Sequence, residues 1–526
     1  MTRRRVLGIL AVLGALGGTG YFLAAAPPSA PFDTAARADR PPRLRPDYGG
    51  IVFPPNIAPL NFIVGEPGDA FDVCFTTDSA DPVHVRSRSP SIIIPPAEWR
   101  RLLRTPGRDL AIDVCVRSAE GQWTRFQTLT SHIAEEPIDR YLVYRRLRPM
   151  YSKYAVMGIF QRDLEGDAET PILRNSTFDG GCVHCHSFAP GDPSHLVLHV
   201  RGPHGMAAII AHDGKVERKD LKTPFGSSPA AFSSWHPGGR ILAFSVNKFI
   251  MQYHSVGEVR DIFDSGSAVA IYRLDDDRVT STDALRQPDR NVSWPAWSAD
   301  GKYLYYCDGP RLTKERYREA LYDLKRIAYD AAADAWGKPE TVLAARDTGL
   351  SILEPRPSPD GRWLLFLMCD YGSLPVYAAS SDLYLLDLGT GRYTKMALNT
   401  NRAETYHGWS TNSRWIVFSS KRDDGVFQRP YFAYLDASGQ DHKPFLLPQA
   451  DPTFYDDHIT MFTVPELLRS PVTVTERELA AAITGLAPEN TPRPSFDPRI
   501  VPHGPDASPQ GPYAAPESSY EDAHGN

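Results

Sequence analysis

Pro357-Ser358-Pro359-Asp360-Gly361-Arg362-Trp363-Leu364-Leu365-Phe366 is one of four segments that share a template. Each begins with Trp or Pro, passes through turn-forming residues and enters a strand in which apolar residues alternate. Asp-Gly and Gly-Gly pairs tolerate the positive φ that a tight hairpin requires. The other three segments begin at Trp235, Trp297 and Trp409.

The first residues of the four segments are 62, 60 and 52 positions apart. This spacing fits one four-stranded sheet with its loops, the size of a propeller blade. Leu196 to Val216 predicts a further blade without the Trp, and Phe445 to Phe462 is expected to help close the ring. We therefore predict an all-β chain with a β-propeller of about six blades over residues 195–466, five and seven blades remaining open.

Residues 48–135 contain short segments with period-two alternation, separated by turn residues, which favours an N-terminal antiparallel β-sandwich domain. Cys74 and Cys115 lie in two of these segments. A disulfide between them and a pair of free thiols are both open at this stage. The sequence does not fix the pairing of Cys307 and Cys369 either.

The first thirty residues indicate export. Arg3, Arg4 and Arg5 precede an apolar stretch, so residues 1–26 are a signal peptide or a membrane anchor. The Pro-rich residues 27–47 are expected to form an extended linker. We expect a periplasmic protein, or one on the outer face of a bacterial inner membrane to which residues 1–26 could attach it.

Composition excludes some classes of function. The chain has 526 residues, 42% hydrophobic and 11% aromatic, with a formal net charge of −6. That charge argues against nucleic-acid binding, for which a basic face is expected. No G-x-S-x-G nucleophile elbow occurs, so we do not expect a serine hydrolase.

Cys182-Val183-His184-Cys185-His186 is a C-x-x-C-H run, the attachment signature of c-type haem. Cys182 and Cys185 are expected to bond one covalent haem c per chain, and His186 to be an axial ligand of the haem iron. A zinc site would need two further ligands nearby, and a thioredoxin-like site would need a βαβ context. Neither pattern is visible in the sequence.

Residues 136–194 are predicted to form a helical bridge together with the haem motif, as a segment inserted before the propeller. The basic run Arg145, Arg146 and Arg148 in this bridge could contact haem propionates or an anionic partner, or could be a solvated helix face. Residues 467–526 are expected to form a short helix near residues 476–483, followed by a disordered Pro-rich tail.

The sixth ligand of the iron determines the chemistry of a haem. Met or His makes an electron-transfer centre, whereas an open position allows small ligands to bind. His199 is the first candidate, and Met206 and His236 are alternatives.

The repeats resemble the WD-like repeats of TolB-type periplasmic propellers. More narrowly, the chain is similar to exported TolB-like proteins that carry one cytochrome c motif. The resemblance covers about residues 50–466 and rests on segments such as Phe53 to Phe62, the haem run through Phe188, Leu198 to Arg201 and His407 to Gly425. It implies a propeller and a haem, but no reaction.

Together these features predict an exported monohaem cytochrome that transfers electrons, with the propeller docking a redox partner protein. Two alternatives remain open. One is a redox enzyme in which the haem relays electrons to a second cofactor near His236, His254 and His407. The other is a TolB-like envelope binding protein whose haem is sensory or structural, because a propeller alone does not imply catalysis.

Overall fold

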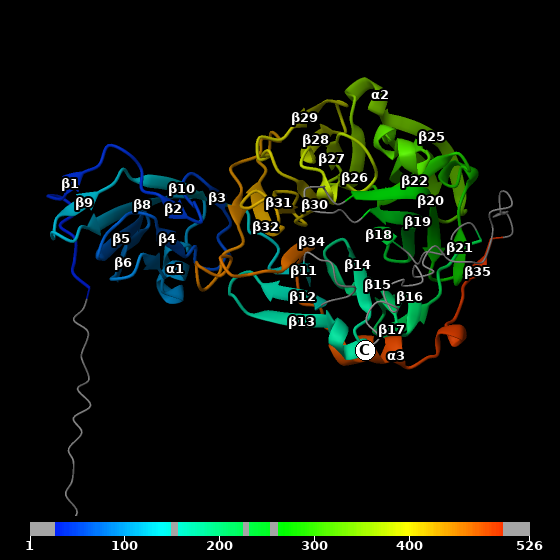
Figure 1. Cartoon of the computed structure of the whole chain (residues 1–526), viewed down its shortest axis with the longest axis horizontal. Helices are drawn as coiled ribbons and strands as arrows, with labels where there is room; N and C mark the ends of the chain where they lie inside the picture. Colours follow the sequence, from blue (N-terminus) through cyan, green and yellow to red (C-terminus); the bar gives the residue numbers. More distant parts are fainter. Residues whose placement is uncertain (1–26, 149–155, 225–230, 253–260, 498–526) are drawn as a thin grey trace, which may run out of the picture.

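A computed structural model of the chain describes residues 27–148, 156–224, 231–252 and 261–497. Six sheets stand around a common axis, and a smaller pair of sheets lies beside this ring (Figure 1). The predicted all-β propeller is confirmed. The predicted leader and residues 498–526 lie outside the described residues, within which no helix has the length and apolar composition needed to cross a bilayer.

Within each sheet of the ring, neighbouring strands are antiparallel, with one exception described below. The innermost strand comes first in the following order: β34 (Met461–Leu468), β11 (Tyr141–Leu147), β12 (Met157–Asp163), β13 (Glu169–Arg174); β14 (Cys182–Ala189), β15 (Asp192–Gly202), β16 (Gly205–His212), β17 (Lys215–Lys219); β18 (Ala231–Trp235), β19 (Ile241–Gln252), β20 (Asp261–Arg273), β21 (Arg278–Thr280); β22 (Arg290–Trp297), β23 (Tyr303–Pro310), β24 (Asp323–Asp330), β25 (Ala335–Leu343); β26 (Ser351–Pro357), β27 (Trp363–Cys369), β28 (Asp382–Asp387), β29 (Tyr393–Lys395); β30 (Glu404–Trp409), β31 (Trp415–Ser420), β32 (Arg429–Tyr434), β33 (Phe445–Leu446).

The ring is closed by strands from distant parts of the sequence. β34 pairs with β11, with Tyr141 opposite Leu468 and Leu147 opposite Met461. The segment expected to close the ring, residues 445–462, supplies only β33 and the start of β34. The closing sheet therefore joins three strands that precede the haem motif to one that follows all the repeats.

The template turns have one hydrogen-bonded form. In three of them a Ser side chain accepts from the backbone N–H five residues later, as Ser358 does from Trp363 at 2.9 Å. The turn residue of each hairpin is left-handed, with φ of 69°, 71° and 71° at Gly239, Gly301 and Gly361 and 60° at Ser413. The predicted positive φ is thus confirmed in all four turns.

The template tryptophans link neighbouring sheets. The Trp235 indole donates to the Ser187 carbonyl of the preceding innermost strand at 3.1 Å, and the Trp409 indole donates to the Arg356 carbonyl at 2.9 Å. Trp297 occupies the same place in its sheet, but its indole N–H is buried and has no partner.

Each innermost strand also carries a bulge at the same level, where two of its residues oppose one residue of the next strand. The first residue of every bulge is left-handed, with φ between 42° and 56°, and none is glycine. They are Cys185, Phe232, Trp294, Glu354, Tyr406 and Val464. A bulge bends its strand and redirects side chains, here toward the axis of the ring.

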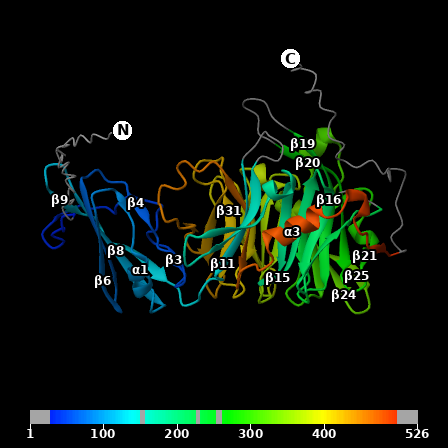
Figure 2. The same ribbon diagram turned by 90° about the horizontal axis from the view of Figure 1, so that it is seen from below.

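The N-terminal domain has two sheets whose apolar side chains share one core. Its seven-stranded sheet contains β1 (Ala36–Arg37), β9 (Trp123–Arg125), β8 (Arg108–Arg117), β10 (Leu129–Ile133), β3 (Val52–Phe53), β5 (Ala70–Thr77) and β6 (Ala80–Ser87). Its three-stranded sheet contains β2 (Leu44–Arg45), β4 (Phe62–Val64) and β7 (Ser91–Ile92). Helix α1 (Pro96–Leu102) completes the domain, which stands at one side of the ring in both Figure 1 and Figure 2.

The core of this domain continues into the propeller. Trp415 and Phe432 of the last sheet belong to the same apolar cluster as the N-terminal strands. The Trp415 indole also donates to the Glu136 carbonyl at 3.0 Å, in the segment that joins the two parts. Packing and hydrogen bonding therefore fix the domain against the ring.

Residues 27–47 do not form the predicted extended linker. Ala36 pairs with Thr124 and Leu44 with Val64, so this segment adds β1 and β2 to the two sheets. Arg40 also donates to the buried Glu66 carboxylate at 2.7 Å. Unpaired strand edges and a buried carboxylate offer partners that composition alone did not reveal.

The predicted helical bridge is also wrong. Residues 141–147 form β11, and the haem motif lies in β14, so residues 136–194 belong to the ring instead of preceding it. The physical reason is pairing: Val143 and Arg145 oppose Glu466 and Thr463 on β34. Pairing with a strand more than 300 residues away therefore determines the structure of this segment, although its local residue spacing is helix-like.

Helix α3 (Glu476–Thr484) confirms the predicted short helix, and a capping box between Thr475 and Glu478 begins it. It packs across the first two sheets of the ring, as Figure 2 shows. Helix α2 (Ala345–Thr348) and five 3-10 turns complete the helical structure in the described residues: Asn175–Phe178, Asp283–Leu285, Lys314–Glu319, Pro375–Tyr377 and Pro488–Asn490.

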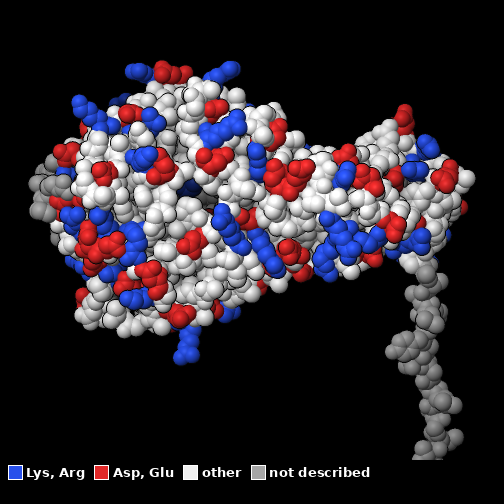
Figure 3. Space-filling model, turned by 180° about the vertical axis from the view of Figure 1, so that it is seen from behind, with Lys and Arg blue, Asp and Glu red and all other residues white. Residues whose placement is uncertain are grey.

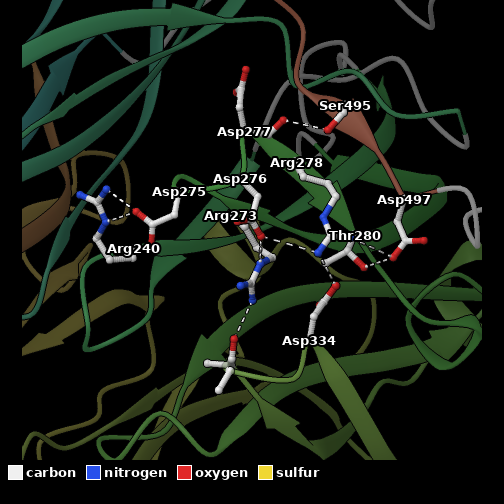
Figure 4. Close-up of polar contacts among 12 residues, drawn as sticks. Arg240, Arg273, Asp275, Asp276, Asp277, Arg278, Thr280, Asp334, Ser495 and Asp497 are labelled. Atoms are coloured by element: carbon white, nitrogen blue, oxygen red, sulfur yellow. Dashed lines mark hydrogen bonds and ion pairs between the residues drawn. The ribbon is translucent and has the colours of Figure 1, made fainter.

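The first part of the predicted disordered tail is ordered. β35 (Ser495–Phe496) pairs in parallel with β21, as a fifth strand of that sheet. Asp497 is 2% exposed and accepts from the Thr280 hydroxyl at 3.3 Å. Figure 4 shows this tail segment beside a cluster of Arg and Asp side chains, in which Arg278 donates to Asp334 at 2.9 Å.

All six cysteines are free. Cys74 lies opposite Asp113 and Cys115 opposite Asp72, so these two thiols are diagonal neighbours on β5 and β8 instead of a direct pair. Diagonal positions are farther apart than directly opposed ones.

The left-handed bulges predict an unusual order of stabilities. At Val464, replacement by Gly should leave the protein about 1 kcal/mol more stable than replacement by Ala, because only glycine adopts positive φ without a steric cost. At Thr341, an exposed position of β25 that does not have positive φ, Gly should be less stable than Ala by about 0.5–1 kcal/mol. Urea unfolding of the four variants measures both differences, and the same order at both sites would refute the strain argument.

Candidate functional site

The haem motif lies on the innermost strand of the second sheet. Cys182 opposes Arg201 and His184 opposes His199 on β15. Directly opposed residues of antiparallel strands point to the same face. The first thiol, two imidazoles and a guanidinium therefore share one face of this sheet.

The bulge falls on the second half of the motif. Cys185 is its left-handed first residue and His186 its second, and together they oppose Leu198. In an unbroken strand, residues three apart point to opposite faces. The bulge interrupts this alternation between Cys182 and Cys185, so the two thiols are not forced to opposite faces of the sheet.

His186 is buried, at 3% exposure, and within the described part of the chain neither of its ring nitrogens makes a hydrogen bond of normal geometry. Its Nε2 lies 3.6 Å from Glu466 Oε1 on β34, too far for a normal hydrogen bond. Burial lowers the pKa of His186 to about 3, so the imidazole is neutral. A neutral imidazole with an available lone pair is the form that ligates a metal.

Two guanidinium groups flank the other histidine of the motif. Arg145 Nη1 lies 2.8 Å from His184 Nδ1, and Arg201 Nη2 lies 3.3 Å from His184 Nε2. Burial, followed by the positive charges of these arginines, holds the pKa of His184 well below its usual value. A neutral imidazole accepts at only one ring nitrogen, so one of the two guanidinium groups donates to His184 and occupies its lone pair. His184 is therefore a poor candidate for a ligand.

Only one member of the predicted basic run reaches the motif. Arg145 is 7% exposed, and besides His184 it donates to the Thr463 hydroxyl at 3.1 Å. Arg146 donates to Glu169 at 2.5 Å, and Arg148 is exposed at the end of its segment. Arg145 and Arg146 are consecutive residues of β11, so their side chains point to opposite sides of the sheet, and Arg148 follows the end of that strand.

The three candidates for a sixth ligand differ in their surroundings. His199 is 7% exposed, lies opposite His184 and has an Nε2 without a partner. Met206 on β16 opposes Arg201 on β15, so it lies two strands away from Cys182 on β14. Both ring nitrogens of His236 have backbone partners, since Nδ1 accepts from Gly238 and Nε2 lies 3.2 Å from the Gly301 carbonyl. His236 takes the place of the Ser in its template turn.

The donor chemistry at the motif fits a c-type haem. Two free thiols, a buried imidazole without partners and a second such imidazole nitrogen at His199 are the groups that covalent attachment and axial ligation require. Within the described ranges, no group of three or more His, Cys, Asp or Glu side chains is placed to hold a metal ion by itself.

A separate cavity of about 230 Å³ lies on the axis of the ring. All six innermost strands line it with residues at or after their bulges, among them Phe188, Ser233, Trp297, Glu354, His407 and Glu466. The face of the molecule in Figure 3 is hollowed near the centre of the ring, where the cavity lies.

The cavity contains charged and titratable groups. Glu354 is 2% exposed, and its Oε2 accepts from the Tyr406 N–H at 2.8 Å and lies 3.7 Å from His407 Nδ1. Burial raises the pKa of Glu354 and of Glu466 to about 7 and lowers the pKa of His407 to about 3. Arg356, also on β26, lines the same cavity.

No sequence pattern points to Glu354, Arg356 or Glu466 as site residues. These side chains line the axial cavity because each lies at or after the bulge of its strand. The left-handed residues of the bulges are not glycines, so the bulges cannot be recognised in the sequence. The sequence predicts a role for His407 only as a ligand of a second cofactor, together with His236 and His254. His254 lies outside the described residues.

No family model matches the chain, and no curated protein matches it. Among solved structures, a periplasmic gluconolactonase of Pseudomonas aeruginosa is similar at 12% identity, covering 75% of this chain and 99% of that chain with a TM-score of 0.33. The Cps50 propeller domain of Myceliophteria thermophila is similar at 11% identity, covering 49% and 66%, with a TM-score of 0.31. A prolyl endopeptidase is similar at 12% identity with a TM-score of 0.33; the match covers 59% of this chain and 49% of that longer protein.

Glu354 should make stability fall as pH rises. Its pKa is raised from 4.5 to about 7 by burial, so the folded state keeps a proton that the unfolded state loses. Relative to Glu354→Gln, the wild type should lose on the order of 2 to 3 kcal/mol of stability between about pH 4.5 and 7, and little more above that range. Urea unfolding at several pH values measures this difference.

The control is Glu340→Gln on the outer strand β25, where the carboxylate is half exposed and paired with Arg326. This variant should follow the wild-type pH dependence. A parallel pH dependence for wild type and Glu354→Gln would show that Glu354 does not hold its proton in the folded state.

Proposed function

We propose that this protein is an exported monohaem c-type cytochrome that transfers electrons, with its TolB-like propeller as the scaffold on which a redox partner protein docks. The observation that carries the proposal is His186: a buried, neutral imidazole beside two free cysteines, with neither ring nitrogen paired. Leaving a buried polar atom unpaired costs about 1–3 kcal/mol. A ligand bond at this histidine would remove that cost.

The residues have distinct roles in this proposal. Cys182 and Cys185 would form the two thioether bonds, His186 would ligate the iron, and His199 is the leading residue for the sixth position. A c-type haem supplies a one-electron redox couple whose potential depends on its ligands and its burial.

Arg145 supports an anionic group at the motif. Its guanidinium is buried, and its partners are the neutral His184 and the Thr463 hydroxyl; within the described residues it makes no ion pair. A buried charge without a counter-charge is unfavourable. Haem propionates are carboxylates, so Arg145 would bind one of them and hold the haem in a fixed orientation.

The remaining parts of the proposal rest on the sequence. The charged and apolar leader of residues 1–26 supports export to the periplasm or attachment to the outer face of the inner membrane. The resemblance to TolB-like proteins with one cytochrome c motif supports the combination of haem and propeller. Electron transfer needs no catalytic group, and the proposal assigns none.

Covalent attachment gives the direct test. Cys182→Ser with Cys185→Ser should abolish haem staining of the protein after denaturing electrophoresis, because no thioether can form. The matched control is Cys74→Ser with Cys115→Ser, a second pair of free thiols in another sheet. The control should stain like the wild type. Staining of the Cys182/Cys185 double variant, or none of the wild type coexpressed with a haem attachment system, would rule out the assignment.

The sixth ligand can be tested by optical spectroscopy. With His199 on the iron, the reduced protein should be low-spin and should not respond to carbon monoxide. His199→Ala should become high-spin and bind carbon monoxide, whereas His236→Ala should not, because His236 is held in its turn. A wild type that binds carbon monoxide would contradict the electron-transfer proposal and favour a sensory haem.

A further inference from the structure

We propose that the axial cavity binds a neutral polyhydroxylated molecule of monosaccharide size, at a site separate from the haem motif. The cavity measures about 230 Å³. Neither Cys182, Cys185 nor His186 lines it. The proposal therefore concerns a second site and does not rest on haem attachment.

Four buried polar atoms in the cavity wall make no hydrogen bond of normal geometry with any described residue. They are Ser233 Oγ, Trp297 Nε1, Glu354 Oε1 and His407 Nδ1, and each belongs to a residue that lines the cavity. They come from four consecutive innermost strands, β18, β22, β26 and β30. Buried polar groups in folded proteins are nearly always paired, so four unpaired ones around one space indicate a bound polar molecule.

Trp297 is the most informative of these residues. The equivalent Trp235 and Trp409 donate to carbonyls of the preceding innermost strand. The Trp297 indole N–H is buried, yet it has no such acceptor among the described residues. The same template position is thus a structural link in two sheets and an available donor in the third.

The four atoms need both donors and acceptors from a ligand. The Trp297 indole only donates, and Glu354 Oε1 accepts when ionised. Because His407 Nε2 lies 3.3 Å from the Leu365 carbonyl, that nitrogen carries the hydrogen and Nδ1 accepts. The Ser233 hydroxyl does both. A ring with several hydroxyl groups satisfies such a mixed wall, since each hydroxyl donates and accepts.

Charge favours a neutral ligand. The wall contains the Glu354 and Glu466 carboxyl groups together with the Arg356 guanidinium. An anion would be repelled by the two carboxyl groups whenever they are ionised, and a cation would be repelled by the guanidinium. Phosphorylated sugars, sugar acids and amines therefore fit less well than an uncharged polyol.

Size and shape agree with a single sugar ring. At roughly 30 Å³ per water molecule, the cavity has the volume of about eight waters, enough for a molecule of about a dozen heavy atoms. Apolar surface from Phe188, Pro237, Pro357 and Leu467 also lines the space. The C–H faces of a sugar ring can pack on such residues while its hydroxyl groups meet the polar atoms.

Isothermal titration of the full-length protein tests the proposal with D-glucose, D-galactose and N-acetyl-D-glucosamine as probes. At least one should bind, and Trp297→Phe should weaken its binding about tenfold by removing one donor, which corresponds to about 1.4 kcal/mol. Ser233→Ala should weaken it by a similar factor. D-gluconate and L-alanine, an anion and a zwitterion, should bind more weakly than the best neutral sugar.

The matched control is Trp336→Phe on the outer strand β25. Trp336 has a buried indole N–H without a partner, but it lies outside the cavity. This variant should bind the sugar like the wild type. The haem-free Cys182→Ser, Cys185→Ser variant should do so too, which separates this proposal from the proposed cytochrome function.

The proposal is overturned if none of the three sugars binds at millimolar concentration, if L-alanine or D-gluconate binds more tightly than all of them, or if Trp297→Phe and Trp336→Phe have equal effects. Equal effects would mean that the indole acts through the fold and not through a contact with the sugar. Thermal unfolding of each variant without sugar checks that it is folded.

Discussion

A left-handed residue interrupts every innermost strand of the ring, and the interior of the propeller depends on this constraint. Each such residue costs about 1 kcal/mol in steric strain when it is not glycine. The cost is tolerated because the flanking residues of each strand remain paired and buried. In return, each bulge bends its strand near the axis and lets consecutive side chains reach the interior, which an unbroken strand would direct to alternate faces.

Both proposed sites are built on this device. In β14 the bulge places Cys185 and His186, and in β30 the equivalent residues are Tyr406 and His407. In β26 the left-handed residue is Glu354, whose carboxylate accepts from the Tyr406 N–H of the neighbouring strand. The haem motif is therefore one variant of a feature present in all six sheets, with cysteine and histidine at positions that hold other residues elsewhere.

The sequence predicted what depends on local chemistry. The Asp-Gly turns after Trp297 and Pro357 require positive φ, and the alternating strands after them form as expected. The haem assignment of Cys182, Cys185 and His186 rests on their spacing and stays a prediction. His236 was not recognised as a turn residue, because a His in place of the template Ser gave no indication that its ring accepts a backbone hydrogen bond.

What the sequence could not predict depends on distant partners. Residues 141–147 have leucines and arginines at both helical and strand spacing, and their pairing with β34 settles the choice. The Pro-rich segment 27–47 and the tail at Phe496 were both expected to be extended or disordered, yet each finds an open strand edge. An open strand edge exists only in the assembled sheet, so no local sequence pattern predicts that these segments will pair with one.

The bulges also separate two electrostatic environments along the axis. His184 precedes the bulge of β14, and it lies between Arg145 of β11 and Arg201 of β15, beside the motif cysteines. At and after the bulges, Glu354 and Glu466 line the cavity, and Arg356 is the one arginine in its wall. A carboxylate-bearing group such as haem is favoured at the first location and disfavoured at the second, where the carboxyl groups would repel it. The arrangement of charge thus supports two different ligands in one propeller, an anionic cofactor held at the motif and a neutral molecule held on the axis.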